Sequence, residues 1–538
     1  MPLLLGIDVG TSSTKAILID DAGAIRATAT APHPSHSPRP SWSEQNPDDW
    51  WASSCAAVRT AIGQARCNPR DIAGVGLSGQ MHGSVLLDAA TIAAKGQRPG
   101  VLRPAILWND QRTAAQCQRI EQLAGGRAAL VRLVGNAALP GFTLPKLLWV
   151  REHEPETWSR VAAVLLPKDY IRFRLTGTLA TDVADAAGTL LLDVDRRDWS
   201  PAACRLFDID PAILPPVLES AAIAGHITPS AADAMGLAEG TPVAAGSGDN
   251  QCGAIGAGVV EPNLILATLG TSGVVYAHAP KPWRDLPQHA SPACGAGGTQ
   301  GSASVPERAA PPPGRVHTMC AADGSATTPG HWSITGCTLS AGGALAWARD
   351  HAFAGAPYET LYAEAAAAPP GCDGLIFLPY LTGERCPHPD PTASGAWIGL
   401  NPRHTRAHLV RAILEGVALT MREILDIMRS IGVAAPASRL GGGGTRSPLW
   451  RDILIAAMNV QGQTMDTEEG PALGAALLAG VGAGLWPSVP EACRRTIHVR
   501  EHIEPNAALV DRYNALAPVF AECYAGLRAT MANLAKQR

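Results

Sequence analysis

The chain has 538 residues, with 43 basic and 47 acidic side chains and a formal net charge of -4 at pH 7. This length exceeds what a single hydrophobic core accommodates and predicts at least two domains. The near balance of charge, without a block of lysine and arginine, excludes an extended nucleic-acid surface and favours a small polar substrate. The 12 cysteines form no C-x-x-C pair, so we expect reduced thiols in a cytoplasmic protein.

The first predicted element is a β-hairpin, because apolar residues at 3–8 and 14–19 flank a Gly/Thr/Ser turn. Such a turn offers backbone N–H groups to an anion, with a carboxylate beside it. It is not a Walker loop, since G-x-x-x-x-G-K-[ST] occurs nowhere in the chain. The residues expected to contact a phosphate here are Asp8, Gly10, Thr11, Ser12 and Lys15, although Lys15 is equally compatible with a solvated strand end.

A second glycine-rich stretch, at 74–79, satisfies G-x-G-x-x-G, but the residues after it predict strand, loop and strand rather than a helix start. We therefore reject a dinucleotide motif.

Met81 and His82 lie in the loop that follows this stretch, among small residues that leave room for a ligand, although a single histidine is more often structural. The aromatic and polar residues at 108–112 suit a carbohydrate, although a buried tryptophan beside a surface turn is nearly as compatible with the sequence.

Apolar residues recur at helical spacing in several segments that alternate with short strand-like runs, which predicts an α/β fold. We expect helices at 50–67, 145–152, 407–431 and 448–459, and strands at 161–166, 190–194, 243–245, 265–269 and 376–378.

Asp249 lies among glycines and small residues after an apolar run, as Asp8 does. An acid in this setting can accept a proton from an attacking hydroxyl or hold a metal ion near a phosphate. Together the two aspartates predict phosphoryl transfer, with one carboxylate near the phosphates and the other at the hydroxyl. A turn cap is the alternative for either. The glycine-rich segment 253–260 is the expected crossover between two lobes, with a boundary near 255.

Two further glycine turns lie in the second half. The turn at 270–272 offers N–H groups and hydroxyls to a phosphate, and its pairing with the first turn favours this function over a plain tight turn. The glycine loop at 441–447 lets a flat ring or a phosphate chain lie against the backbone. The residues expected at the ligand are Gly270, Thr271, Ser272, Gly442, Gly443 and Ser447.

Two segments have unusual composition. Residues 295–314 are rich in Gly, Ser, Ala and Pro, which predicts a mobile surface loop. The uncharged stretch 471–487 approaches the length of a membrane span, but its glycines and terminal prolines favour a packed helix and turn.

These motifs resemble those of the FGGY carbohydrate kinases along nearly the whole chain. The stretch 6–12 is similar to the first phosphate motif of the family, 270–272 to the second and 441–447 to the adenosine motif. Longer family patterns lie at 142–149 and 395–415. The resemblance is strongest to the xylulokinase branch, through 76–83, 166–170 and 182–188.

The resemblance implies two actin-like (ribonuclease-H-like) lobes with nucleotide and sugar between them, and ATP-dependent phosphorylation of D-xylulose. It implies that Asp249 is the general base, that Asp8 helps to hold Mg²⁺ with ATP, and that Met81, His82 and Asn250 position the sugar. The expected domains are an N-terminal lobe at 1–254, a C-terminal lobe at 255–500 and a helical tail at 501–538.

Two alternatives remain at this level. One is a related kinase acting on ribulose, gluconate or glycerol, and the other is an actin-like ATPase without sugar transfer. We expect no nucleic-acid or membrane partner, and a homodimer is an expectation carried over from relatives.

Overall fold

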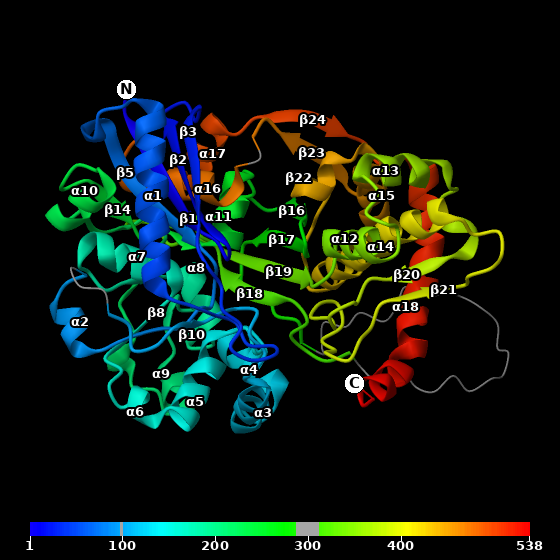
Figure 1. Cartoon of the computed structure of the whole chain (residues 1–538), viewed down its shortest axis with the longest axis horizontal. Helices are drawn as coiled ribbons and strands as arrows, with labels where there is room; N and C mark the ends of the chain where they lie inside the picture. The colour runs from blue at the N-terminus through cyan, green and yellow to red at the C-terminus, as the bar shows by residue number, and fades with distance from the viewer. Residues whose placement is uncertain (97–99, 287–310, 468, 538) are drawn as a thin grey trace.

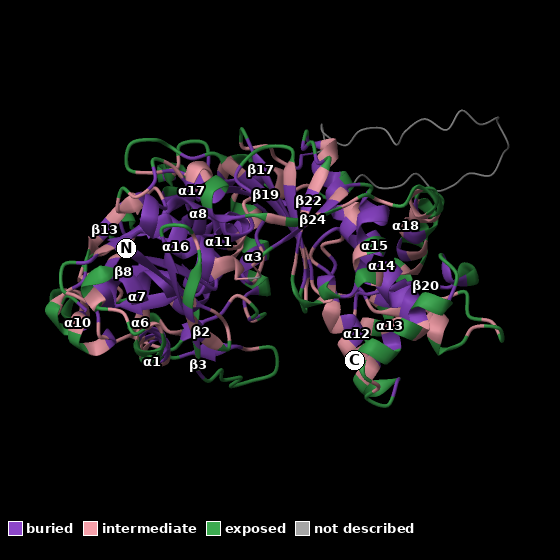
Figure 2. Ribbon diagram, turned by 90° about the horizontal axis from the view of Figure 1, so that it is seen from above, coloured by how far each residue is buried: buried purple, intermediate pink, exposed green. Residues whose placement is uncertain are grey.

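The structure is a computed structural model that describes residues 1–96, 100–286, 311–467 and 469–537. Residues 295–310 of the predicted surface loop lie outside the described residues. Two lobes lie side by side (Figure 1), and Figure 2 shows buried residues concentrated inside each of them. No helix in the described part of the chain is long and apolar enough to cross a membrane.

The N-terminal lobe is built on a mixed sheet in the order β13-β14-β5-β1-β2-β3, with β15 also paired to β5. The predicted hairpin is confirmed as the antiparallel pair β1 and β2, and β5 runs parallel to β1. The strands are β1 (Leu3–Val9), β2 (Ser13–Asp20), β3 (Ile25–Pro32), β5 (Ile72–Gly79), β13 (Ile223–His226), β14 (Pro242–Ala244) and β15 (Ser247–Gly248).

The C-terminal lobe repeats this arrangement in a sheet of order β18-β19-β17-β16-β22-β23-β24. An antiparallel hairpin, β16 and β17, again has a parallel strand, β22, beside its first member. The shared topology confirms two related α/β lobes. The strands are β16 (Leu264–Leu269), β17 (Gly273–Ala279), β18 (His317–Cys320), β19 (Trp332–Thr338), β22 (Ala437–Gly441), β23 (Gln461–Met465) and β24 (Val499–Ile503).

The predicted helices are confirmed, with ends shifted by a few residues. Helix α1 begins at a proline that fits the first turn, where Asn46 Oδ1 accepts a hydrogen bond from Asp48 N at 3.1 Å. The helices are α1 (Pro47–Ala65), α5 (Thr143–His153), α14 (Arg406–Ser430) and α15 (Pro448–Met458). The predicted short strands are also present, as β8 (Ala163–Leu165), β10 (Leu192–Asp193), β14, β16 and β20 (Ile376–Leu378).

Helix α16 (Gly470–Gly482) confirms the packed helix predicted near 471–487, and it lies against β1 and β5 of the N-terminal lobe. Glycines in both strands permit this approach. A Cβ atom on Gly76 would lie 1.8 Å from Ala475 O, and one on Gly6 would lie 2.0 Å from Ala472 O. The G-x-G-x-x-G match at 74–79 therefore belongs to a strand that packs beneath a helix, and β6 (Val85–Leu87) follows it, as the rejection of a dinucleotide motif predicted.

Helix α11 (Asp249–Gly256) runs across residue 254, where we predicted the end of the first lobe. It crosses α16 at close range, since a Cβ atom on Gly474 would lie 1.9 Å from Cys252 O. Because α16 returns to the N-terminal lobe, that lobe contains a segment from the predicted 255–500 domain. The predicted tail at 501–538 begins inside β24 and continues as α18 (Ala507–Ala535).

Candidate active site

The two glycine-hydroxyl turns occupy matching positions, each at the tip of the central hairpin of its lobe. Gly10 N donates to Ser13 O at 3.0 Å in the first turn, and Gly270 N donates to Ser272 O at 3.0 Å in the second. Ser12 and Thr271 are exposed at these tips. Backbone N–H groups at such turns can bind phosphate oxygens without any change of side chain.

Side chains of the N-terminal lobe hold the first turn. Trp108 Nε1 donates to Thr11 Oγ1 at 3.0 Å, and Gln45 Nε2 donates to Thr11 O at 2.6 Å. The polar end of the half-buried indole thus meets the phosphate turn, and the interpretation of 108–112 as an aromatic face for a carbohydrate stays a prediction.

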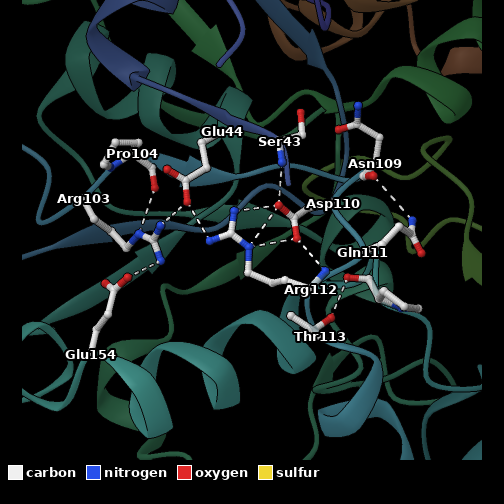
Figure 3. Close-up of polar contacts among 11 residues, drawn as sticks. Ser43, Glu44, Arg103, Pro104, Asn109, Asp110, Gln111, Arg112, Thr113 and Glu154 are labelled. Carbon is white, nitrogen blue, oxygen red and sulfur yellow. Dashed lines mark hydrogen bonds and ion pairs between the residues drawn. The ribbon is translucent and has the colours of Figure 1, made fainter. Parts of the chain in front are cut away.

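The segment that carries Trp108 is fixed by buried charges (Figure 3). Arg112 binds Asp110 through Nη2 at 2.7 Å and Glu44 through Nη1 at 2.7 Å. Asp110 also accepts a hydrogen bond from Ser43 N at 2.6 Å. A buried ion pair whose remaining hydrogen bonds are satisfied restricts its loop to one geometry. This network therefore positions the indole that holds Thr11.

The second turn rests on the start of helix α12 (Gly342–His351). Gly342 N donates to Gly270 O at 2.8 Å, and Gly343 N donates to Thr271 O at 3.0 Å. A Cβ atom on Gly342 would lie 2.5 Å from Gly270 O, so only glycine permits this contact. We did not predict these two glycines, although adjacent glycines before a helix pattern were a usable signal.

Asp249 begins helix α11, directly after the last residue of β15. Burial and the nearby negative charge of Asp8 raise the pKa of Asp249 to about 7, against hydrogen bonds from Asn250. Asn250 Nδ2 donates to Asp249 Oδ1 at 3.1 Å and lies 3.8 Å from Met81 Sδ. The fold thus brings together two acids, an amide and the predicted sugar loop from segments far apart in the chain.

Asp8 is at the end of β1, and burial raises its pKa although Ser78 and Lys15 oppose this shift. Within the described residues, its Oδ1 atom is buried without a hydrogen-bond partner. A buried carboxylate oxygen without a partner fits a hard cation such as Mg²⁺. Lys15 forms an ion pair with Glu469 at 2.8 Å, which ties the hairpin to the residue before α16. Sequence reasoning missed Glu469.

Met81 and His82 lie in the buried loop after β5. His82 has a positive φ of 69°, a conformation that non-glycine residues adopt at a cost and that clusters at functional sites. Its Nδ1 atom lies 3.1 Å from Gly188 O. Burial lowers the pKa of His82 well below its usual value, with the charges of Lys146 and Arg385 acting in the same direction. The imidazole is therefore neutral and can both donate and accept.

A buried lysine, Lys146, supports the backbone of this loop. Sequence analysis included it only within the family pattern at 142–149. Lys146 Nζ donates to His82 O at 2.9 Å and to Gly141 O at 2.8 Å. Burial lowers the pKa of Lys146 well below its usual value. Lys146 therefore fixes the backbone of the sugar loop rather than contacting a phosphate.

His317 is another residue that the sequence did not reveal. It begins β18 of the C-terminal lobe, and its ring lies 5.3 Å from that of Phe142, which is 4.6 Å from His82. Both ring nitrogens of His317 are buried without a hydrogen-bond partner among the described residues. Burial and the charge of Arg385 lower the pKa of His317 to about 3. Two unsatisfied nitrogens at this position suit the hydroxyls of a ligand.

Two cavities border the glycine loop of the C-terminal lobe. One, of about 880 Å³, is lined by the second turn, the start of α12 and the glycine loop, including Gly270, Thr271, Gly443 and Ser447. The other, of about 500 Å³, joins Asp249 and Asn250 to Gly442. Ser447 Oγ also caps α15 by accepting from Trp450 N at 3.4 Å. The larger cavity has the size and glycine-lined wall of a nucleotide site.

Comparison with known proteins agrees with this arrangement. Residues 3–256 match the N-terminal domain, and residues 266–483 the C-terminal domain, of the FGGY family of carbohydrate kinases. The chain is 36% identical over 524 residues to a xylulose kinase from Bacillus subtilis (strain 168), covering 97% of each. It is 38% identical over 536 residues to a xylulose kinase from Escherichia coli (strain K12), covering 98% of this chain and 100% of the relative.

The crystal structure of a xylulose kinase from Rhodospirillum rubrum has a TM-score of 0.82 to this structure at 29% identity, covering 98% of this chain and 100% of that one. Both domains of the family and the full length of its relatives are thus matched. The chain belongs to the FGGY family of carbohydrate kinases and has its two actin-like lobes.

Proposed function

We propose that this chain transfers the γ-phosphoryl group of ATP to the terminal hydroxyl of D-xylulose, giving D-xylulose 5-phosphate and ADP. The observation that carries the proposal is Asp249, a buried carboxylate whose pKa is raised to about 7 and which lies beside both Asp8 and the sugar loop. Similarity to xylulose kinases over nearly the whole chain supports D-xylulose as the substrate.

Asp249 acts as the general base. A carboxylate with a pKa of about 7 is ionised in half of the molecules at neutral pH and is basic enough to accept the proton of an attacking hydroxyl. Asn250 donates to Asp249 Oδ1 and thereby orients the carboxylate. The proton moves from the terminal hydroxyl of the sugar to Asp249 as the new P–O bond forms.

The sugar is held by groups from both lobes. Met81 and the neutral imidazole of His82 form one wall, with Lys146 fixing the backbone beneath them. His317 contributes from the C-terminal lobe, where sugar hydroxyls satisfy its two nitrogens. Mixed donors and acceptors of this kind fix the orientation of a polyol, so that only one hydroxyl reaches the base.

The triphosphate lies between the two turns, with N–H groups near Gly10, Thr11 and Ser12 on one side and near Gly270, Thr271 and Ser272 on the other. Mg²⁺, when bound, would neutralise charge on the β- and γ-phosphates. Asp8 is the residue that would hold it, because its Oδ1 atom lacks a partner among the described residues. The adenosine occupies the cavity of about 880 Å³ beside Gly443.

The proposal includes a cytoplasmic location, supported by the unpaired state of the described cysteines. Assembly as a homodimer stays a prediction, which analytical ultracentrifugation tests.

The reaction is tested by ADP release with Mg-ATP and a panel of D-xylulose, L-xylulose, D- and L-ribulose, gluconate and glycerol, with a blank that lacks sugar. We expect D-xylulose to give the highest kcat/KM, by at least tenfold. A preference for another sugar would support a sugar kinase and refute D-xylulose as its substrate. Equal ADP release with and without every sugar would refute phosphoryl transfer to a sugar.

A further inference from the structure

Three side chains outside the cleft converge near the far end of β17. This strand begins at the second phosphate turn, and His278 is its penultimate residue. His278 Nε2 lies 3.0 Å from Asp323 Oδ2, and His331 Nδ1 lies 2.6 Å from the same oxygen. The possible ligand atoms of the three residues all lie within 4.8 Å of one another.

The cluster is built into the sheet on one side and open on the other. The side chains of His278 and Asp323 are 1% and 3% exposed, whereas that of His331 is 53% exposed. Asp323 Oδ1 accepts a hydrogen bond from His331 N at 2.8 Å, which orients the carboxylate. Although burial raises the pKa of Asp323, hydrogen bonds from both imidazoles hold it well below its usual range.

The surrounding charges leave one negative charge for a cation. Arg197 is a nearby cation, and it is paired with Glu219 at 2.7 Å. The hydrogen bond that His331 donates to the Asp323 carboxylate raises the pKa of His331. Arg197 and Glu219 thus cancel, and Asp323 remains as the uncompensated charge when both imidazoles are neutral.

We propose that His278, Asp323 and His331 form a binding site for Zn²⁺ or a similar first-row divalent ion, separate from the magnesium of the reaction. Two imidazoles and one carboxylate are a common set of zinc ligands, and a water molecule would complete a tetrahedron from the exposed side. Ligand atoms of a tetrahedral zinc site are about 3.3 Å apart. The nitrogen–oxygen distances of 3.0 and 2.6 Å are close to this value, and on metal binding the proton that each nitrogen shares with Asp323 shifts to the other ring nitrogen or to solvent.

The site would act as a structural clip within the C-terminal lobe rather than as a catalytic centre. It joins β17 to the loop between β18 and β19, and the N-terminal lobe docks on this loop. Arg197 donates to the carbonyl oxygens of His331 and Ala321, and Ala221 N donates to Gly324 O at 3.1 Å. A bound ion would hold the loop in the conformation that the N-terminal lobe contacts.

The test compares the wild-type protein with His331→Ala, whose side chain is exposed and whose loss should not prevent folding. His226→Ala is the matched control, since His226 is also exposed and lies outside the cluster. Each protein is stripped with EDTA, equilibrated with zinc, dialysed and analysed for bound metal. We expect one more zinc per chain in the wild type and in His226→Ala than in His331→Ala, and affinity at least about tenfold lower in His331→Ala.

Two further measurements distinguish this site from adventitious binding at cysteines. Cobalt(II) substitution should give the visible absorption of a tetrahedral nitrogen and oxygen site in the wild type, and Asp323→Asn should abolish it. Zinc should raise the Tm of the wild type and not that of His331→Ala, while both keep kinase activity with Mg-ATP. Equal zinc content in wild type and His331→Ala, or no zinc in either, would overturn the proposal and leave a hydrogen-bonded His-Asp-His cluster.

Discussion

Asp249 is both the centre of the proposed chemistry and a source of instability. Its position at the start of α11 favours a carboxylate, because the N-terminus of a helix carries partial positive charge. Burial and Asp8 outweigh this effect and raise its pKa to about 7. The same environment that makes the group a useful base therefore opposes its ionisation in the folded protein.

We expect the pH dependence of the reaction to follow this carboxyl group. Because the base must be deprotonated, log kcat/KM for the sugar should rise with a slope of one up to a pH of about 7 and then level. Asp249→Asn should lower kcat by a factor of about 10² to 10⁴ and leave the Kd for ATP within twofold. Steady-state kinetics and nucleotide titration measure these quantities. Sugar phosphorylation near the wild-type rate in this variant would refute the assignment of Asp249 as the general base.

The same variant should be more stable than the wild type in alkaline solution. The pKa of Asp249 rises from its ordinary value of 3.8 to about 7, so between these values the folded protein holds a proton that the unfolded chain has released. Stability due to this group is therefore present below pH 4 and is lost as the pH rises through 7. At pH 8, Asp249→Asn should increase the free energy of unfolding by roughly 1–4 kcal/mol, a gain that disappears near pH 4.

Urea denaturation at the two pH values measures this difference. A variant less stable than the wild type at pH 8 would contradict the assigned cost of the buried carboxylate.

At the scale of elements, glycines decide how closely helices approach strands and ligands. Gly76 in β5 faces Ala475 of α16, and the contact leaves no room for a methyl group. A Cβ atom placed on Gly443 in the glycine loop would have no neighbouring atom within 4 Å, and Gly443 lines the proposed nucleotide cavity. Glycine thus permits close packing in β5, and in the glycine loop it leaves the proposed nucleotide cavity open.

Gly76→Ala should destabilise the protein by about 2–4 kcal/mol, because the new methyl group forces α16 away from the sheet. Gly63→Ala is the control. Gly63 is exposed on α1 with no atom near its Cβ position, so this change should stabilise the protein by about 0.5–1 kcal/mol. Chemical denaturation measures both. Equal stabilities for the two variants would contradict the tight packing of α16.

Gly443→Ala should preserve the fold and raise the KM for ATP by a factor of about 5 to 50, since its methyl group projects into the cavity. The KM for the sugar should stay within twofold. Gly526→Ala in α18 is the control, because a Cβ atom at this position would also have no neighbouring atom within 4 Å. It should change neither KM. An unchanged KM for ATP in Gly443→Ala would place the adenosine elsewhere.

At the scale of the whole molecule, the lobes are joined by crossing helices and by contacts away from the turns. Helices α11 and α16 meet through glycine, with Cβ positions on Gly256 and Gly474 only 2.0 and 1.9 Å from backbone oxygens. On the β18 side, Asn136 Nδ2 donates to Thr318 O at 2.8 Å. These contacts favour a hinge at the crossing helices, about which the two phosphate turns approach each other.

Binding of sugar together with a non-hydrolysable ATP analogue should therefore reduce the radius of gyration by a few per cent in small-angle X-ray scattering. The Asp249→Asn variant should show the same decrease, because the substitution removes the base and leaves the groups that bind sugar and nucleotide. ATP hydrolysis without sugar should stay below about one hundredth of the sugar-dependent rate, since closure excludes water. Identical scattering with and without both ligands would contradict closure.

The motifs were predictable because each is short and local. The hairpin at β1 and β2, the turn at Gly270, the glycine loop before α15 and the acid at 249 depend on neighbours within a few residues, so residue type and spacing were sufficient. The helices and strands were located to within a few residues for the same reason. The ends of elements were less accurate, because they depend on packing between distant segments as well as on local sequence. The lobe boundary near 255 stays a prediction.

The sequence by itself determined which chemical groups this kinase carries and the two-lobed α/β class, because apolar periodicity and glycine placement are properties of the chain. Only the tertiary structure decided which groups meet. His317 packs near Phe142, Glu469 pairs with Lys15, Gly342 supports the second turn, and His278 reaches Asp323 and His331. These contacts link residues from distant segments, and their formation follows from the burial of the two sheets rather than from any local pattern.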